Sequence, residues 1–143
     1  MKRAIVLLGL VLLLVQCSDD NQSSASGNKT ATPSSSVIGF RSVAPQAGQL
    51  LIANKKDMVL LDVRTPQEVM RDGTIKGAQL VPFGAIMQNR LNVGPDTPIL
   101  VFCAVGGRSY FAGQVLAKNG YKEVYNLAGG IEAWRNAGYP LVH

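Results

Sequence analysis

A short apolar run that ends in a cysteine, two glycines and an arginine most constrains what this chain can fold into. Residues 98–102 read Pro-Ile-Leu-Val-Phe, without a polar side chain. A continuous apolar run of this length is typical of a strand buried on both faces of a parallel sheet. Residues 109–119 then carry apolar side chains at helical intervals, and Gly120 is suited to end that helix. Cys103 is therefore predicted at a strand end before a helix N-terminus, where open α/β sheets bind ligands.

The residues that follow the run favour an anion at the centre of the loop. Gly106 and Gly107 can adopt backbone angles closed to other residues, so that successive N–H groups turn toward one point. That nest, the helix dipole and the Arg108 guanidinium all favour negative charge. A thiol placed there is expected to have a pKa below the reference value of about 8.5. The loop thus predicts Cys103 as a thiolate nucleophile; the alternative is a buried structural cysteine, since free cysteines are commonly buried.

Three stretches of the sequence resemble the single-domain rhodaneses. Residues 103–109, Cys-Ala-Val-Gly-Gly-Arg-Ser, are similar to the active-site loop of that family, whose usual form is Cys-x-Ser-Gly-x-Arg-Ser. Residues 61–68, Leu-Asp-Val-Arg-Thr-Pro-Gln-Glu, resemble the family's first signature, and residues 128–134, Ala-Gly-Gly-Ile-Glu-Ala-Trp, its C-terminal one. The resemblance covers residues 37–142, and it rests on the three motifs occurring in the expected order.

The resemblance implies a sulfurtransferase that needs no metal or organic cofactor. The Cys103 thiolate would attack the outer sulfur of a donor such as thiosulfate and become a persulfide. Its partners would be a small sulfur-containing anion, a low-molecular-weight thiol or a thiol-bearing protein. The persulfide would be held by the loop residues that follow it: Ala104, Val105, Gly106, Gly107, Arg108 and Ser109.

The chain departs from the family pattern in two places. Thr74 and Lys76 stand where the family often has a histidine and a proline, so that a contact made by that histidine would be missing. Val105 stands where a small polar residue is usual, which removes a hydroxyl from the loop. These departures leave the preferred substrate open.

Three charged residues around the first signature are expected to support the loop. Asp62 would accept backbone N–H bonds at the end of its strand, and Arg64 would pair with Glu68. The alternative is a plain strand-end cap and an exposed ion pair, worth about 0–1 kcal/mol. His143 is the only histidine and stands at the C-terminus, which argues against a Cys-His pair, so that the loop itself must activate the thiol.

Two other functions are compatible with parts of this pattern. Phosphatases of a related fold also pair a loop cysteine with an arginine, but with five residues between them, whereas four separate Cys103 from Arg108. The tighter loop suits a sulfur atom better than a phosphoryl group. A sulfur carrier or non-catalytic binding module tethered to the envelope would have the same sequence features, and only turnover separates it from an enzyme.

The first 36 residues read as a leader and a tether. Residues 1–16 combine Lys2 and Arg3 with an uncharged apolar run, the pattern of a signal peptide. Cys17 follows at once and resembles the lipidated cysteine of bacterial lipoproteins, although Gln16 departs from the usual small residue. Residues 17–36 are mainly small and polar, as in a flexible tether. We therefore expect a lipid-anchored protein of the bacterial envelope that faces the periplasm, or an exported soluble one if Cys17 is not lipidated.

The charge and the cysteine content argue against nucleic acid as a partner and against a disulfide. The chain has a net charge of +5, and removing Lys2 and Arg3 leaves 12 basic and 9 acidic residues, or +3. That mild excess suits small anions, and no basic run with interleaved aromatic residues suggests nucleic acid. The two cysteines are not expected to form a disulfide, because one stands at the leader boundary.

Residues 37–143 are predicted to form one α/β domain with a central parallel sheet and helices on both faces, because strand and helix patterns alternate. The expected strands are residues 38–43, 58–63, 79–81, 99–102 and 123–126. The expected helices are residues 45–54, 66–71, 83–90, 109–119 and 131–137. Trp134 is expected to anchor the core.

Overall fold

The computed structural model describes residues 39–143 of the chain. The predicted signal peptide, the lipidation site at Cys17 and the tether up to residue 36 therefore lie outside the described residues. Within residues 39–143, the structure contains no helix with the length and apolar character that a membrane span requires.

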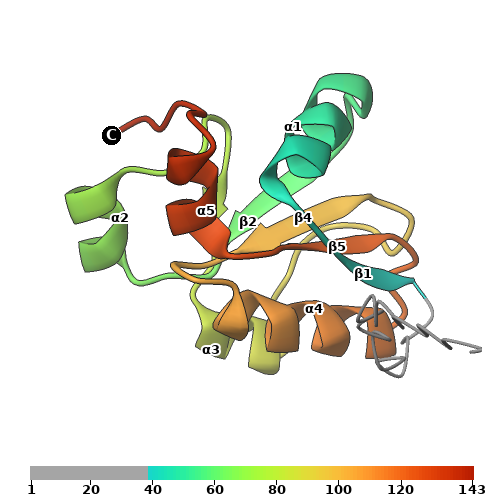
Figure 1. The fold of residues 1–143 in the computed structure, drawn as a ribbon. Helices are drawn as coiled ribbons and strands as arrows, with labels where there is room; N and C mark the ends of the chain where they lie inside the picture. Colours follow the sequence, from blue (N-terminus) through green and yellow to red (C-terminus); the bar gives the residue numbers. More distant parts are fainter. Residues whose placement is uncertain (1–38) are drawn as a thin grey trace, which may run out of the picture. The chain divides into compact units, whose positions relative to one another are not determined.

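Strands and helices alternate along the described chain, as the sequence pattern predicts (Figure 1). The strands are β1 (Phe40–Val43), β2 (Val59–Asp62), β3 (Gln79–Leu80), β4 (Ile99–Phe102) and β5 (Val124–Leu127). The helices are α1 (Pro45–Asn54), α2 (Pro66–Asp72), α3 (Phe83–Met87), α4 (Gly107–Lys118) and α5 (Gly130–Asn136). All strand pairs are parallel, in the order β1-β5-β4-β2-β3. The predicted α/β class with a central parallel sheet is confirmed.

Two helix boundaries differ from the prediction by more than one residue. Helix α3 ends at Met87 and not at residue 90, because Asn89 has a φ of 53°, outside the helical region. Helix α4 begins at Gly107 and not at Ser109, because Gly106, in the left-handed conformation, stands directly before its first turn. The earlier start of α4 brings its N-terminus closer in sequence to Cys103.

The side chains of the central strand alternate between two hydrophobic cores, one on each face of the sheet. Val101 packs in a core with residues of α3 and α4, whereas Leu100 and Phe102 pack in a second core with residues of α5. Figure 1 shows α3 and α4 on one face of the sheet and α1 and α5 on the other. All four residues of β4 are fully buried, as the apolar run predicts. Cys103 continues the alternation and belongs to the core on the α4 side.

The C-terminal segment is tied back onto the domain. Trp134 is 2% exposed, which confirms it as a core residue, and its indole N–H donates to the carbonyl of Pro140 at 3.0 Å. Thr74 and Val142 exchange backbone hydrogen bonds of 2.7 and 2.8 Å in an isolated antiparallel bridge. This bridge places the segment beside the loop after α2, which contributes to the surroundings of Asp62.

Candidate active site at Cys103

Cys103 lies directly after β4, with its thiol turned into the loop of residues 103–109. The residue is 1% exposed and free of any disulfide. The backbone N–H of Gly106 donates to its Sγ at 3.1 Å, and the Ser109 hydroxyl lies 3.5 Å from the same atom. Burial fits a structural cysteine, but donors directed at the sulfur fit a thiolate. The geometry therefore supports the reactive interpretation.

The two glycines of the loop have different roles. Gly106 has a φ of +95°, and a Cβ added there would lie 2.9 Å from the backbone nitrogen of Gly129. Gly107 has no positive φ, and a Cβ there would meet nothing within 4 Å. Of the two glycines that can adopt angles closed to other residues, only Gly106 does so, because Gly107 is already the first residue of helix α4.

This difference gives a matched pair of substitutions. Gly106→Ala is expected to lower the free energy of unfolding by about 1–3 kcal/mol, because it strains the backbone and crowds Gly129. Gly107→Ala should change it by less than about 0.5 kcal/mol. Urea denaturation of both variants measures the effect, and alkylation of Cys103 by iodoacetamide should be slowed in the Gly106 variant alone. Similar losses in both variants would contradict this account of the loop.

At the Cys103 thiol, hydrogen bonds together lower the pKa by more than burial raises it. Burial alone would raise the pKa of Cys103, but the Ser109 hydroxyl and the backbone N–H groups of Ser109, Gly106 and Val105 stabilise the thiolate, and the pKa is lowered. Because these amides lie at or just before the first turn of α4, the helix dipole acts in the same direction. The structure therefore supports the predicted low pKa of this thiol.

A buried polar network continues from Ser109 to the edge of the sheet. The Ser109 hydroxyl lies 2.6 Å from Oδ1 of Asn126 and 3.1 Å from the carbonyl of Gly106, and the Asn126 amide donates to Ser42 at 3.0 Å. A hydroxyl has one proton, so these acceptors compete with the sulfur for it. Sequence reasoning missed Asn126, although an asparagine within the buried strand Val-Tyr-Asn-Leu was a usable signal.

Ser109→Ala tests the hydroxyl's effect on the thiol. The thiolate fraction rises with pH and levels off above the pKa, so removing a donor that lowers the pKa should move the midpoint of Cys103 alkylation to higher pH. Below both midpoints the rate should fall by up to about tenfold for each unit of displacement. Iodoacetamide alkylation between pH 5 and 10 measures this. Ser42→Ala, at the far end of the network, is the control and should leave the midpoint in place; an unmoved midpoint in Ser109→Ala would contradict the assignment.

Arg108 is paired with Glu68 across the site. Its NH1 and NH2 donate to the two carboxylate oxygens of Glu68 at 2.9 and 2.5 Å. The bond from Arg108 is the main cause that lowers the pKa of Glu68 to about 2, with a further contribution from Thr65. The pKa of Arg108 is raised, mainly by its bond with Glu68 and to a smaller extent by Cys103. The guanidinium is thus paired with a carboxylate and close enough to the thiol for their charges to interact.

The expected pair between Arg64 and Glu68 is wrong, because Arg64 binds Asp62. Arg64 donates to Asp62 through Nε at 2.9 Å and through NH2 at 2.6 Å, and its backbone N–H donates to the same carboxylate at 3.1 Å. Both side chains are about 1% exposed or less, so neither is a surface group. The expected backbone bond to Asp62 is confirmed. Thr74, at the position of the family's histidine, donates its hydroxyl to Asp62 at 2.8 Å.

The start of helix α5 fixes the other side of the loop. The backbone N–H groups of Ile131 and Glu132 donate to the carbonyls of Cys103 and Ala104 at 2.9 and 3.1 Å. Gly130 has a φ of +58°, and a Cβ there would lie 2.3 Å from the carbonyl oxygen of Cys103. The C-terminal motif, residues 128–134, therefore holds the loop in place through these hydrogen bonds. The residues alone suggest no role for this motif in the site.

The predicted residues fall into two groups. In the loop of residues 103–109, Gly106 and Ser109 contact the sulfur, Arg108 pairs with Glu68, and Val105 is 60% exposed. Asp62 and Arg64 form a separate buried pair, connected to the loop through the backbone bond of Val63 to Phe102. Within residues 39–143, no group of three or more His, Cys, Asp or Glu side chains is placed to hold a metal ion.

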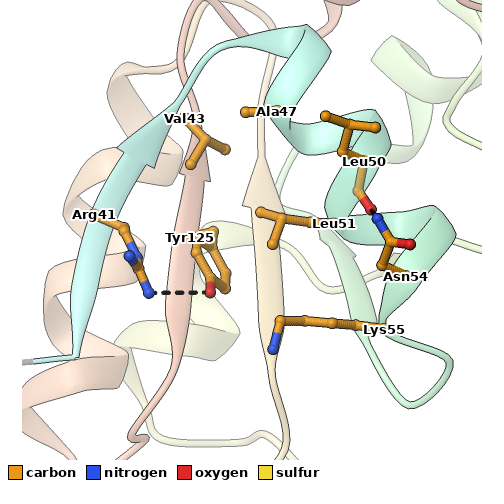
Figure 2. A pocket seen from close by; sticks show the side chains of 8 residues that line it. All are labelled: Arg41, Val43, Ala47, Leu50, Leu51, Asn54, Lys55 and Tyr125. Atoms are coloured by element: carbon orange, nitrogen blue, oxygen red, sulfur yellow. Dashed lines mark hydrogen bonds between the residues drawn. The ribbon is translucent and has the colours of Figure 1, made fainter.

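A separate hollow of about 300 Å³ lies between β1 and α1 (Figure 2). Its lining includes Leu51 and Tyr125, which belong to the core on the face of the sheet opposite Cys103. Its two cationic side chains are engaged, since Arg41 donates to the Tyr125 hydroxyl at 3.2 Å and Lys55 lies 2.8 Å from Glu123. The hollow is therefore distinct from the site around the thiol.

The chain is similar to several known proteins. The family model for the rhodanese-like domain matches residues 45–137. A sulfurtransferase of Allochromatium vinosum is 37% identical over 91 residues, which cover 64% of this chain and 84% of that protein. A thiosulfate sulfurtransferase of Ectopseudomonas mendocina is 34% identical over 96 residues, which cover 67% and 85%. Among solved structures, a Rhodopseudomonas palustris protein of unknown function, described as a possible tyrosine phosphatase, aligns with a TM-score of 0.65 at 28% identity over 72% of this chain and 85% of its own.

Proposed function

Because this chain belongs to the rhodanese-like domain family, we propose that it is a sulfurtransferase that carries sulfane sulfur as a persulfide on Cys103. Its sulfurtransferase relatives support sulfur transfer as the general activity. The observation that carries the proposal is the sulfur of Cys103 at the centre of the loop, with the Gly106 N–H at 3.1 Å and the pKa of the thiol lowered.

The reaction takes two balanced steps. The Cys103 thiolate attacks the outer sulfur of thiosulfate, the S–S bond of the donor breaks, and sulfite leaves with the bonding electron pair. The product on the protein is the Cys103 persulfide anion. An acceptor then attacks the terminal sulfur; cyanide gives thiocyanate, and a thiolate gives a new persulfide. Each step releases the enzyme in a form ready for the next, which is covalent catalysis with ping-pong kinetics.

The loop supplies what both steps require. Hydrogen-bond donors that stabilise the thiolate also suit the persulfide, because its negative charge lies only one sulfur atom further out. Arg108 lies beside that charge, and its own position is fixed by Glu68. Neither bond change needs a metal or an organic cofactor, because the donor provides the leaving group and the acceptor provides the second nucleophile.

The cellular location of the protein is proposed from the sequence alone. Residues 1–16 followed by Cys17 support export and lipid anchoring at a membrane, facing the periplasm. Labelling of the chain with an azido fatty acid in a bacterial host, with Cys17→Ser as the unlabelled control, tests the anchor.

A sulfur carrier is the second candidate. The full burial of Cys103 favours it, because a sulfur that is 1% exposed would accept sulfur most easily from a partner that opens the loop. A phosphatase has less support, because the four residues between Cys103 and Arg108 are one fewer than in phosphatases of the related fold.

One assay separates these functions. The purified chain is incubated with thiosulfate or with methanethiosulfonate, and its intact mass is measured before and after cyanide is added. A gain of one sulfur atom, its removal by cyanide and continuous formation of thiocyanate support the proposed enzyme. A stable adduct without turnover favours the carrier. Absence of an adduct with both donors would overturn sulfur transfer through a persulfide, and hydrolysis of an aryl phosphate would then favour a phosphatase.

A further inference from the structure

We infer that Glu68 sets the charge selectivity of the Cys103 site, which accepts singly charged or neutral sulfane-sulfur donors in preference to dianions. This inference rests on the proposed persulfide chemistry and deepens it. Arg108, the one cationic side chain of residues 103–109, is paired with the carboxylate of Glu68.

Glu68 is held in place independently of any substrate. Besides Arg108, its carboxylate accepts the backbone N–H of Thr65 at 2.9 Å and the Thr65 hydroxyl at 3.0 Å, in the capping box that starts helix α2. Its two oxygens match the two terminal nitrogens of Arg108, the geometry of a bidentate pair. An incoming anion therefore meets a guanidinium that is already paired, by a partner anchored to the start of a helix.

The reacting state carries more negative than positive side-chain charge. The Cys103 thiolate and Glu68 contribute two negative charges, and Arg108 contributes one positive charge. Glu68 stays ionised at any working pH, because its pKa is about 2. The three groups together have a net charge of −1, so that the attraction for a donor must come from backbone N–H groups and the helix dipole.

This charge balance acts differently on donors of different charge. Coulomb energy is proportional to the charge of the donor, so a dianion such as thiosulfate is opposed by Glu68 about twice as strongly as a monoanion. Thiosulfonates with an uncharged substituent and the persulfides of thiols without net charge carry at most one negative charge, yet they offer an outer sulfur of the same kind. The site therefore fits these donors better than inorganic dianions.

The chemistry is equivalent for the two probe donors. With thiosulfate, the Cys103 thiolate takes the outer sulfur and sulfite leaves as a dianion. With methanethiosulfonate, the same S–S bond forms on the protein and methanesulfinate leaves as a monoanion. Both reactions give the same Cys103 persulfide, so a difference between them reports on donor recognition.

Glu68→Gln in the full chain tests the inference. Glutamine keeps the size of the side chain and can serve at the third position of a capping box, so helix α2 is retained. The measurement is kcat/KM for thiosulfate and for methanethiosulfonate, with cyanide as acceptor, at a pH above the thiol's midpoint. We expect kcat/KM to rise about tenfold for thiosulfate and about threefold for methanethiosulfonate, with most of the change in KM.

The comparison of donors distinguishes selectivity from a general effect. A change in the reactivity of the thiol would alter kcat/KM by the same factor for both donors. The charge effect instead predicts that the factor for thiosulfate is about the square of the factor for methanethiosulfonate. Asp72→Asn is the control on the same helix, because Asp72 pairs with Arg71 at 2.8 Å and with Arg64 at 3.8 Å but not with Arg108. The ratio of the two donor activities should stay unchanged in this variant.

The inference would be overturned if Glu68→Gln changed kcat/KM by equal factors for the two donors, or lowered the ratio of thiosulfate to methanethiosulfonate activity. Either result would leave the proposed function intact. Absence of a Cys103 persulfide with both donors, in the unmodified chain as well as in the variant, would instead overturn the proposed function and the inference with it. The thermal midpoint of unfolding, measured for each variant, excludes a loss of folding as the cause.

Discussion

Replacing Cys103 with serine is expected to abolish persulfide formation and to reduce thiocyanate production by a factor on the order of 10³ or more. A serine hydroxyl at neutral pH is not ionised, and its oxygen does not form a stable bond to sulfane sulfur under these conditions. Serine is close in size to cysteine and can accept the N–H of Gly106 that the sulfur accepts at 3.1 Å. The domain should therefore stay folded, with a loss of about 1 kcal/mol in unfolding free energy.

Cys17→Ser is the matched control for this prediction. Cys17 is the other cysteine of the sequence, and its replacement should leave thiocyanate formation by the purified protein unchanged. Intact mass after the donor should show one added sulfur atom in the Cys17 variant and none in the Cys103 variant. An adduct that persists in Cys103→Ser would move the reactive sulfur away from this loop.

Local sequence patterns were sufficient for the elements that position the site. The apolar run before Cys103 becomes strand β4, fully buried, and the prolines at residues 45 and 66 begin helices α1 and α2 as expected. These features depend on backbone angles and on burial, which neighbouring residues determine. The position of Cys103 between a strand and a helix follows from them.

Pairing of charged side chains could not be predicted in the same way. Glu68 has Arg64 four residues before it and Arg108 forty residues after it, and closeness in sequence favoured the wrong partner. The capping box at Thr65 orients Glu68 toward the start of α2, while Asp62 binds Arg64 across two residues. Glu68 pairs with Arg108, which only the tertiary fold brings near it, and no local pattern records such a contact.

The buried pair of Asp62 and Arg64 gives the largest effect expected on stability. Asp62→Asn should lower the free energy of unfolding by about 3–5 kcal/mol, because it leaves the buried Arg64 guanidinium with only the partly exposed Asp72 carboxylate, 3.8 Å from its Nη1, as a compensating charge. That guanidinium is completely buried, and apart from Asp62 it donates to the carbonyl of Gly73 at 2.6 Å. Its Nη1 has no hydrogen-bond partner among the described residues, because the Asp72 carboxylate at 3.8 Å is beyond hydrogen-bond distance. Urea denaturation followed by circular dichroism measures the loss.

A double-mutant cycle decides whether the loss comes from an uncompensated charge. Arg64→Met alone should cost a similar amount, and the double variant should cost several kcal/mol less than the sum, since no buried charge remains unpaired. Arg71→Met is the exposed counterpart: Arg71 also pairs with an aspartate at 2.8 Å, but its side chain is 72% exposed, so its loss should cost less than about 1 kcal/mol. Because Asp62 ends the strand beside β4, destabilisation here should also slow persulfide formation at Cys103. Additive costs in the cycle would show that the two side chains contribute independently, and that packing, not charge compensation, stabilises this edge of the site.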